Sequence, residues 1–183
     1  MFCLRSFLAP LLACLLALPG HAAEQEVLTG PAHVIDGDTV DLEGTRVRLG
    51  GIDAPERAET CTHPSGATWS CGRWAWHETE RLIQGETLRC VDLGRRSYGR
   101  VVARCYHAGK DLAETLIHQG IARVCPRFAA QQGVLERYTA AEDRARRQNA
   151  GIFAGPLNPP AGFCARRDAG TAPGDTSPSP DQG

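Results

Sequence analysis

The sequence lacks the patterns that identify several large protein classes. Its longest apolar run, residues 7–18, falls short of the roughly 20 residues that a membrane-spanning helix needs. It shows no internal repeat of the kind that builds solenoids. It has no EF-hand loop, because the Asp spacing and the closing Glu are absent, and no common zinc-finger spacing. We therefore expect the chain of 183 residues to contain one folded domain with a single core.

The two ends of the chain differ in composition from its middle. Residues 1–23 carry one charge, Arg5, before the apolar run and end in small residues, which is typical of a cleavable signal peptide. A lipoprotein signal at Cys14 fits less well, because the apolar run continues past it. Residues 168–183 are rich in Gly, Pro, Ser, Thr, Ala and Asp, which predicts a disordered tail. We expect a secreted or periplasmic protein with its folded domain within residues 24–167 and no membrane association in its mature form.

The balanced charge of the whole chain hides a basic folded region. The chain has 20 Lys and Arg against 21 Asp and Glu, and residues 27–167 keep 19 of the former and 16 of the latter, a net charge of +3. Acidic residues that bind a cation would leave the remaining surface more basic still. A mildly basic surface suits a protein that binds a polyanion.

The mature region keeps six of the eight cysteines. An even number in an exported chain indicates disulfides, and six cysteines allow 15 pairings. Cys61 and Cys71 enclose a short polar loop that a disulfide would stiffen. A zinc site formed by these two cysteines with His63 and His77 is the alternative.

A predicted hairpin suggests the second pair of cysteines. Residues 87–93 and 100–106 have the composition of strands and flank a turn rich in Gly and Arg. If the hairpin is centred near Ser97, Cys90 faces Cys105, and opposed residues lie close enough for a disulfide. By elimination, the third pair is Cys125 and Cys164.

The order of predicted elements indicates the fold class. Residues 27–51 read as three strands, and the hairpin adds two more. Helices are expected over residues 72–84, 112–119 (with Asp111 as N-cap) and 134–149, with a short extended run at 121–124. Short strands with helices between them predict an α+β fold, a five-stranded barrel of the oligonucleotide-binding type with three α-helices.

Four acidic residues lie in two turns. Asp36 and Asp38 flank Gly37 in the first, and Asp53 and Glu56 belong to the second, Gly-Gly-Ile-Asp-Ala-Pro-Glu. Asp-Gly-Asp alone is common in plain hairpin turns. Two acidic turns separated by short strands can instead converge on one cation, and carboxylate oxygens on loops suit calcium or magnesium.

Two arginines are candidate phosphate-binding residues. Arg48 lies on the strand between the acidic turns, on the same face as Arg46, and Arg100 begins a later strand. The alternative for Arg100 is an ordinary solvent-exposed arginine at the end of a strand. A guanidinium group matches two phosphate oxygens and stays charged. Together with a bound cation and a carboxylate that can deprotonate water, such as Glu56, these residues predict phosphodiester hydrolysis.

Three blocks of the sequence together resemble the signature of thermonucleases of the staphylococcal nuclease type. They are residues 34–40 (Val-Ile-Asp-Gly-Asp-Thr-Val), 48–56 (Arg-Leu-Gly-Gly-Ile-Asp-Ala-Pro-Glu) and 98–100 (Tyr-Gly-Arg). Residues 116–124 look like that family's second helix and following strand. The resemblance covers most of residues 33–154 and implies a five-stranded barrel with three helices.

The resemblance also implies an activity and a metal. The expected protein is a calcium-dependent endonuclease that acts on DNA and RNA, single-stranded or locally melted, and leaves 3′-phosphate ends. Asp38, Asp53 and the backbone carbonyl of Ala54 would bind Ca²⁺, with Asp36 in a supporting position. No stable protein partner is evident, and we expect a monomer.

The same resemblance assigns the catalytic residues. Glu56 would be the general base, and Arg48 and Arg100 would contact the phosphate. Tyr98, from the Tyr-Gly-Arg block, is a candidate substrate contact. So is Phe128, which aligns with one of two tyrosines that pack the nucleotide in the family and could keep the stacking interaction.

Several positions depart from the family pattern. Ala54 stands where the family has threonine, which keeps a carbonyl ligand but removes a side-chain contact. Ser97 stands where the family has a lysine, so one phosphate contact is lost. Pro126 replaces the other of the two tyrosines. The cysteines are absent from the type member and fit a variant that relies on cross-links.

Two other functions fit the sequence less well. A catalytically idle barrel that binds nucleic acid or protein would be expected to lose a ligand, the base or a phosphate contact. This chain keeps all of them, namely Asp38, Arg48, Asp53, Glu56 and Arg100. A small disulfide-rich binding module would explain the cysteines but not the ordered acidic and arginine blocks.

Overall fold

The structure is a computed structural model that describes residues 25–155 and Cys164. The predicted signal peptide at residues 1–23 and the predicted tail at 168–183 lie outside the described residues. The domain boundaries therefore stay predictions.

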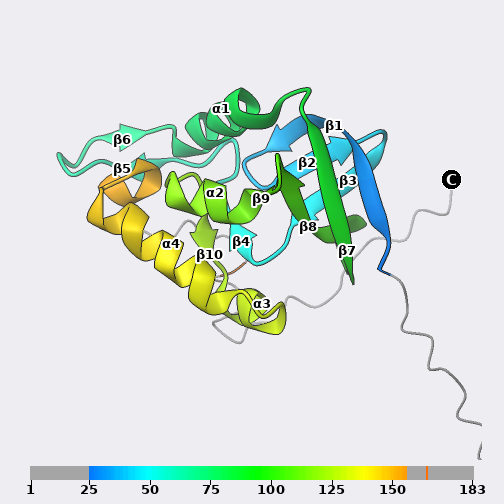
Figure 1. The fold of residues 1–183 in the computed structure, drawn as a ribbon. Helices are drawn as coiled ribbons and strands as arrows, with labels where there is room; N and C mark the ends of the chain where they lie inside the picture. The colour runs from blue at the N-terminus through cyan, green and yellow to red at the C-terminus, as the bar shows by residue number, and fades with distance from the viewer. Residues whose placement is uncertain (1–24, 156–163, 165–183) are drawn as a thin grey trace, which may run out of the picture.

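Five strands close into a barrel (Figure 1). They are β1 (Val27–Asp36), β2 (Thr39–Leu42), β3 (Thr45–Leu49), β7 (Thr87–Ser97) and β8 (Arg100–His107). Neighbours in the order β3-β2-β1-β7-β8 are antiparallel, and a parallel pairing of β3 with β8 closes the barrel. The short β9 (Lys110–Asp111) pairs with β8. The five-stranded barrel predicted from the sequence is confirmed.

Alternation along the strands places apolar side chains inside the barrel. In β1, Ala32 and Val34 are buried, whereas their neighbours Pro31 and His33 are exposed. Val40, Val47 and Leu88 contribute to the same core from β2, β3 and β7. Each fully buried side chain of this kind stabilises the fold by roughly 1.5–3 kcal/mol.

Three longer helices pack on the barrel, as predicted. They are α1 (Cys71–Ile83), α2 (Leu112–His118) and α4 (Leu135–Arg147), with ends within two residues of the expected ones. Asp111 caps α2, because its side chain accepts the backbone N–H of Glu114 at 3.3 Å. No helix in the described part of the chain is long and apolar enough to cross a membrane.

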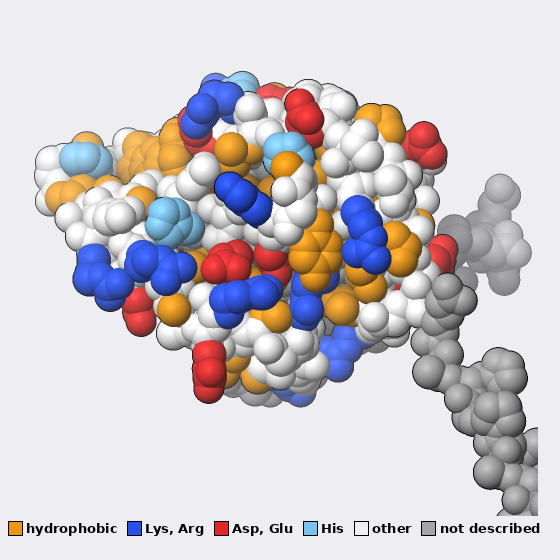
Figure 2. Space-filling model, in the orientation of Figure 1, with side chains coloured by type: hydrophobic (Ala, Val, Ile, Leu, Met, Phe, Trp, Pro, Cys, Tyr) orange, Lys and Arg blue, Asp and Glu red, His pale blue; other side chains and the backbone are white. Residues whose placement is uncertain are grey.

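Helices α2 and α4 are joined by a polar network. The hydroxyl of Tyr138, which is fully buried, donates to Asp111 at 3.0 Å, and Arg137 pairs with Glu114 at 3.0 Å. Figure 2 shows basic side chains beside acidic ones on this face. Much of the positive charge of α4 is therefore neutralised locally.

Short elements that the sequence does not clearly predict complete the fold. They are β4 (Ile52–Asp53), β5 (Cys61–Thr62), β6 (Thr68–Trp69), β10 (Arg123–Val124), α3 (Pro126–Gln131) and a 3₁₀ turn, η1 (Gly151–Ala154). Of these, only β10 falls within a predicted extended run, residues 121–124. The pairing of β4 with β10 matters most, because it carries one of the acidic residues.

The β7–β8 hairpin brings Cys90 opposite Cys105, and the two form a disulfide, as predicted. The turn itself lies at Tyr98-Gly99, where both residues have positive φ (50° and 78°), as in a two-residue type I′ turn. A bulge between Asp92 and Arg95 then shifts the register. The predicted pairing is correct because the bulge compensates for a turn displaced from its expected centre.

The other two predicted disulfides are also present. Cys61 is bonded to Cys71, which ties the small β5–β6 hairpin to the start of α1, and Cys125 is bonded to Cys164. Because Cys61 and Cys71 are bonded to each other, the alternative zinc site does not form.

We expect the protein in which Cys90 and Cys105 are both replaced by alanine to lose about 3 kcal/mol of unfolding free energy. The bond spans a sequence separation of 15 residues, and its removal raises the conformational entropy of the unfolded chain. Urea unfolding measures the loss. Non-reducing peptide mapping of the parent protein is the control, and a peptide joining Cys90 to any other cysteine would contradict the register.

Candidate active site

The two acidic turns lie against each other because glycine permits their approach. The first joins β1 to β2 through Gly37, and the second contains the short strand β4 and continues through Ala54 to Glu56. A Cβ atom on Gly37 would lie only 2.6 Å from the Cβ of Ala54, so any side chain there would push the turns apart. Across this contact, the backbone N–H of Ala54 donates to Oδ2 of Asp38 at 3.3 Å.

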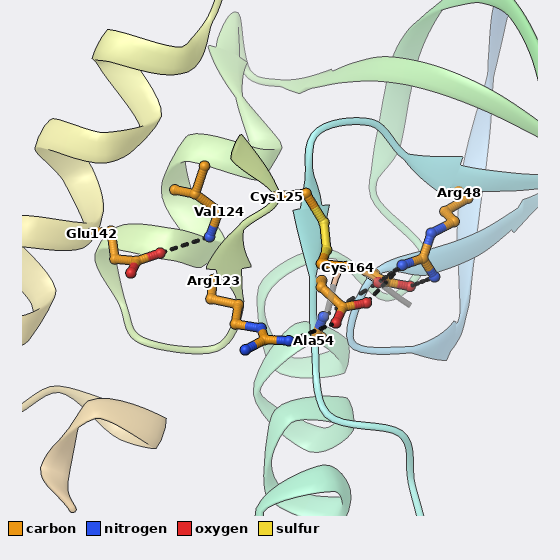
Figure 3. The surroundings of a disulfide bond; sticks show 9 residues. Arg48, Ala54, Arg123, Val124, Cys125, Glu142 and Cys164 are labelled. Atoms are coloured by element: carbon orange, nitrogen blue, oxygen red, sulfur yellow. Dashed lines mark hydrogen bonds and ion pairs between the residues drawn. A yellow bond between two sulfur atoms is a disulfide. The ribbon is translucent and has the colours of Figure 1, made fainter. Parts of the chain in front are cut away.

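Arg48 lies between Asp38 and Asp53 and bridges them. Its Nη1 donates to Oδ1 of Asp38 and its Nη2 to Oδ1 of Asp53, both at 2.9 Å, and Nη2 also lies 2.9 Å from Oδ2 of Asp38. Arg48, Asp38 and Asp53 are only 5%, 3% and 5% exposed. Figure 3 shows Arg48 at this junction. Two predicted ligands and one predicted phosphate contact thus form a single buried cluster.

This buried cluster holds more negative charge than Arg48 neutralises. Burial raises the pKa of the Asp38 carboxyl to about 7, since the opposing effect of Arg48 is offset by the carboxylates of Asp36 and Asp53. Burial alone would lower the pKa of Arg48, but the charges of Asp38 and Asp53 raise it above its ordinary value. An additional cation would favour the ionised form of Asp38.

Asp36 belongs to the turn that carries Asp38. It ends β1, is half-buried, and its Oδ1 accepts the backbone N–H of Asp38 at 3.0 Å. The side chain therefore helps to fix the conformation of this turn.

Glu56 has an exposed side chain on a firmly held backbone. Its N–H donates to Oε2 of Glu59 at 2.9 Å. The start of α1 packs on its carbonyl so closely that a Cβ on Gly72 would lie 1.7 Å from that oxygen. Although the side chain is exposed, neighbouring atoms displace part of the water around the Glu56 carboxyl, which raises its pKa, and the charge of Asp36 adds to the rise.

Arg100 joins the cluster through Thr39. Its Nη1 donates to Oγ1 of Thr39 at 3.1 Å, and that hydroxyl donates to Oδ1 of Asp38 at 3.0 Å. Its Nε donates to the carbonyl of Ser97 at 3.1 Å, which anchors the side chain to the β7–β8 turn. The hairpin, distant in sequence, is thereby connected to the first acidic turn.

An open hollow of about 540 Å³ adjoins these residues. Its wall includes Asp36, Thr39, Arg46, Tyr98 and Arg100. Tyr98 is 76% exposed at the tip of the hairpin, and its ring centroid lies 6.0 Å from Cζ of Arg100. Phe128 is half-buried in α3 and is not among the described residues of this wall, so the two predicted substrate contacts are not brought together here.

Arg123 is a site residue that the sequence alone did not reveal. It lies directly opposite Asp53 in the β4–β10 pairing, and its Nη2 is 3.5 Å from Oδ2 of Asp53. Cys125, which follows it closely, is tied to Cys164 (Figure 3). A two-residue strand has too little periodicity to indicate where its arginine lies.

The chemistry of the cluster fits a hard cation. Asp38 and Asp53 provide carboxylate oxygens, the donors that Ca²⁺ prefers, and the backbone of Ala54 is in contact with Asp38. Among the described residues, no three His, Cys, Asp or Glu side chains form one metal-binding group.

Comparison with known proteins identifies the family. A sequence model of the family described as "Staphylococcal nuclease homologue" matches residues 46–154, more than half of the chain. The chain belongs to this family. The resemblance noted from the three sequence blocks is thus confirmed. The six cysteines that the structure describes all form disulfides.

The relatives of the chain include two proteins named as endonucleases and one named for succinoglycan biosynthesis. It is 36% identical to the succinoglycan biosynthesis protein ExoI of Rhizobium meliloti, over 81% of this chain and 75% of that protein. It is 27% identical to endonuclease YncB of Bacillus subtilis, over 73% and 65%. It is 31% identical to a probable endonuclease, LCL3, of Schizophyllum commune, over 73% and 49%. The chain therefore spans less than two thirds of these two endonucleases.

Proposed function

We propose that the protein is an exported, calcium-dependent endonuclease that hydrolyses phosphodiester bonds in single-stranded or locally melted DNA and in RNA. One observation carries the proposal. Hydrogen bonds join Asp53, Arg48, Asp38, Thr39 and Arg100 into one set beside an open hollow. Membership of the family and the endonuclease names of several relatives support nucleic acid as the substrate.

In this proposal the acidic cluster holds the cation. Asp38, Asp53 and the backbone carbonyl of Ala54 would be its protein ligands, with Asp36 supporting the turn. Bound calcium would supply positive charge that polarises a phosphoryl oxygen and stabilises charge in the transition state. The burial of both aspartates keeps their carboxylates oriented before substrate arrives.

The two arginines would contact the scissile phosphate. Arg48 lies between the proposed ligands and so lies beside any phosphate bound there. Arg100 uses Nε and Nη1 for its anchoring hydrogen bonds, while its Nη2 has no partner among the described residues. A guanidinium group that is held in place and still has N–H donors available suits phosphate binding.

Glu56 would accept the proton of the attacking water. Its side chain is exposed, so water reaches it, and its raised pKa moves its basicity toward neutral pH. Attack at phosphorus with loss of the 5′-oxygen leaves the phosphate on the 3′ end.

Export and assembly form part of the same proposal. The signal-like residues 1–23 support a secreted or periplasmic location, and the disulfides suit an oxidising compartment. We propose that the protein acts as a monomer.

We expect the mature protein to cleave single-stranded DNA and RNA with calcium and to lose this activity in excess chelator. Gel assays measure the cleavage, and mass spectrometry of the products should find 3′-phosphate ends. Restoring calcium to the chelated sample is the control. Absence of calcium-dependent cleavage would favour the alternative, a catalytically idle barrel that binds nucleic acid or protein.

A further inference from the structure

A second arginine lies on the wall of the hollow beside Arg100. Arg46 precedes Arg48 by two positions in β3, so the two share a face of the strand. Arg48 is buried in the acidic cluster, whereas Arg46 is exposed and lines the hollow together with Arg100 and Tyr98.

The guanidinium group of Arg46 has no hydrogen-bond or ion-pair partner among the described residues. Its cross-strand neighbour on β2 is Asp41, the residue from which a neutralising contact would be expected. Asp41 instead accepts the backbone N–H of Gly44 at 2.7 Å and closes the β2–β3 turn. All five N–H donors of Arg46 are thus available to a ligand in the hollow.

The charges on the wall favour an anion. Arg46 and Arg100 contribute two positive charges, against one negative charge from Asp36, whose Oδ1 accepts the backbone N–H of Asp38. Arg100 is anchored on the side of the acidic cluster through Thr39. Arg46 is therefore placed to contact a second phosphate of a substrate whose first phosphate lies at the acidic cluster.

We propose that Arg46 binds the phosphate next to the scissile one and so favours polynucleotides over substrates with a single phosphodiester. This inference rests on the proposed nuclease function, because it concerns the same site.

Kinetics of Arg46→Ala test this subsite against a matched control, Arg89→Ala. Arg89 is also an exposed strand arginine, and it has no ion pair with any residue that the structure describes. It lies opposite Thr29, about 23 Å along β1 from Asp36. For a short oligothymidylate we expect Arg46→Ala to raise KM about tenfold, with little change in kcat. For thymidine 5′-(p-nitrophenyl phosphate), which has one phosphodiester, KM should match that of the parent protein.

Direct binding separates this inference from the proposed function. In the Glu56→Gln background, fluorescence anisotropy with labelled oligothymidylate should show weaker binding for Arg46→Ala only. The slope of log Kd against log salt should also fall by about 1 for that variant. Equal binding by the Arg46 and Arg89 variants would overturn the role of Arg46, whether or not the parent protein cleaves DNA. Cleavage of neither substrate by the parent would overturn the nuclease proposal alone.

Discussion

In chelator, the free energy of unfolding is expected to fall by about 3–5 kcal/mol when Arg48 is replaced by methionine. The reason is that Asp38 and Asp53 are both almost completely buried and share this guanidinium. Methionine fills much of the same space but leaves two carboxylates without their common partner. Calcium is expected to restore part of the loss if it binds these carboxylates, because a ligand that binds only the folded state stabilises it.

Urea unfolding with and without calcium measures this prediction, and Arg89→Met serves as the control. Arg89 is exposed, so its replacement should change stability by no more than about 0.5 kcal/mol. Cleavage by Arg48→Met should be lost even in saturating calcium, because the proposed phosphate contact is gone. If Arg48→Met unfolds in chelator at the same urea concentration as the parent, Arg48 does not stabilise the buried cluster.

For Glu56→Gln we expect kcat to fall by about 10²–10⁴-fold with unchanged stability. Glutamine keeps the shape of the side chain but cannot take a proton from water. Stability should hold because the side chain is exposed and because the hydrogen bonds of Glu56 among the described residues use its backbone N–H and carbonyl, both with Glu59.

Single-turnover cleavage and urea unfolding test this second prediction together. Glu136→Gln, a change at an exposed glutamate in the first turn of α4, is the control and should leave both quantities unaltered. Full activity in Glu56→Gln would remove Glu56 from the mechanism and require another base.

The barrel could be predicted because its strands and helices carry local signals. Ala32 and Val34 alternate with exposed residues in β1, and Tyr138, Ala141 and Ala145 recur at helical spacing in α4. The short strands β4 and β10 carry no such signal, since two residues cannot show a period. They exist because the closed fold brings Ile52 and Val124 together.

The hairpin shows how a correct pairing can arise from a different register. The sequence pattern predicts a turn centred near Ser97. In the structure the turn residues are instead Tyr98 and Gly99, which both have positive φ angles. The bulge before Arg95 compensates for this displacement, so that Cys90 still meets Cys105. Bulges depend on how the whole strand packs and twists, and a strand's own composition does not encode their position.

By itself the sequence determined the barrel, its three longer helices, the disulfide pairs and the family. It also singled out Asp38, Asp53, Glu56, Arg48 and Arg100, because each lies in a short block whose residue types suit phosphate chemistry. Their roles remain predictions until the variants are measured.

Only the tertiary structure decided which charges meet. Arg48 is paired with two aspartates, Arg123 reaches Asp53 from another strand, and Arg46, two residues from Arg48, has no described partner. In the sequence, Arg46 and Arg48 lie in one predicted strand and on the same face of it. Closure of the barrel buries one beside carboxylates and leaves another facing an open hollow, and the energy of a charge depends on its burial and its neighbours in space.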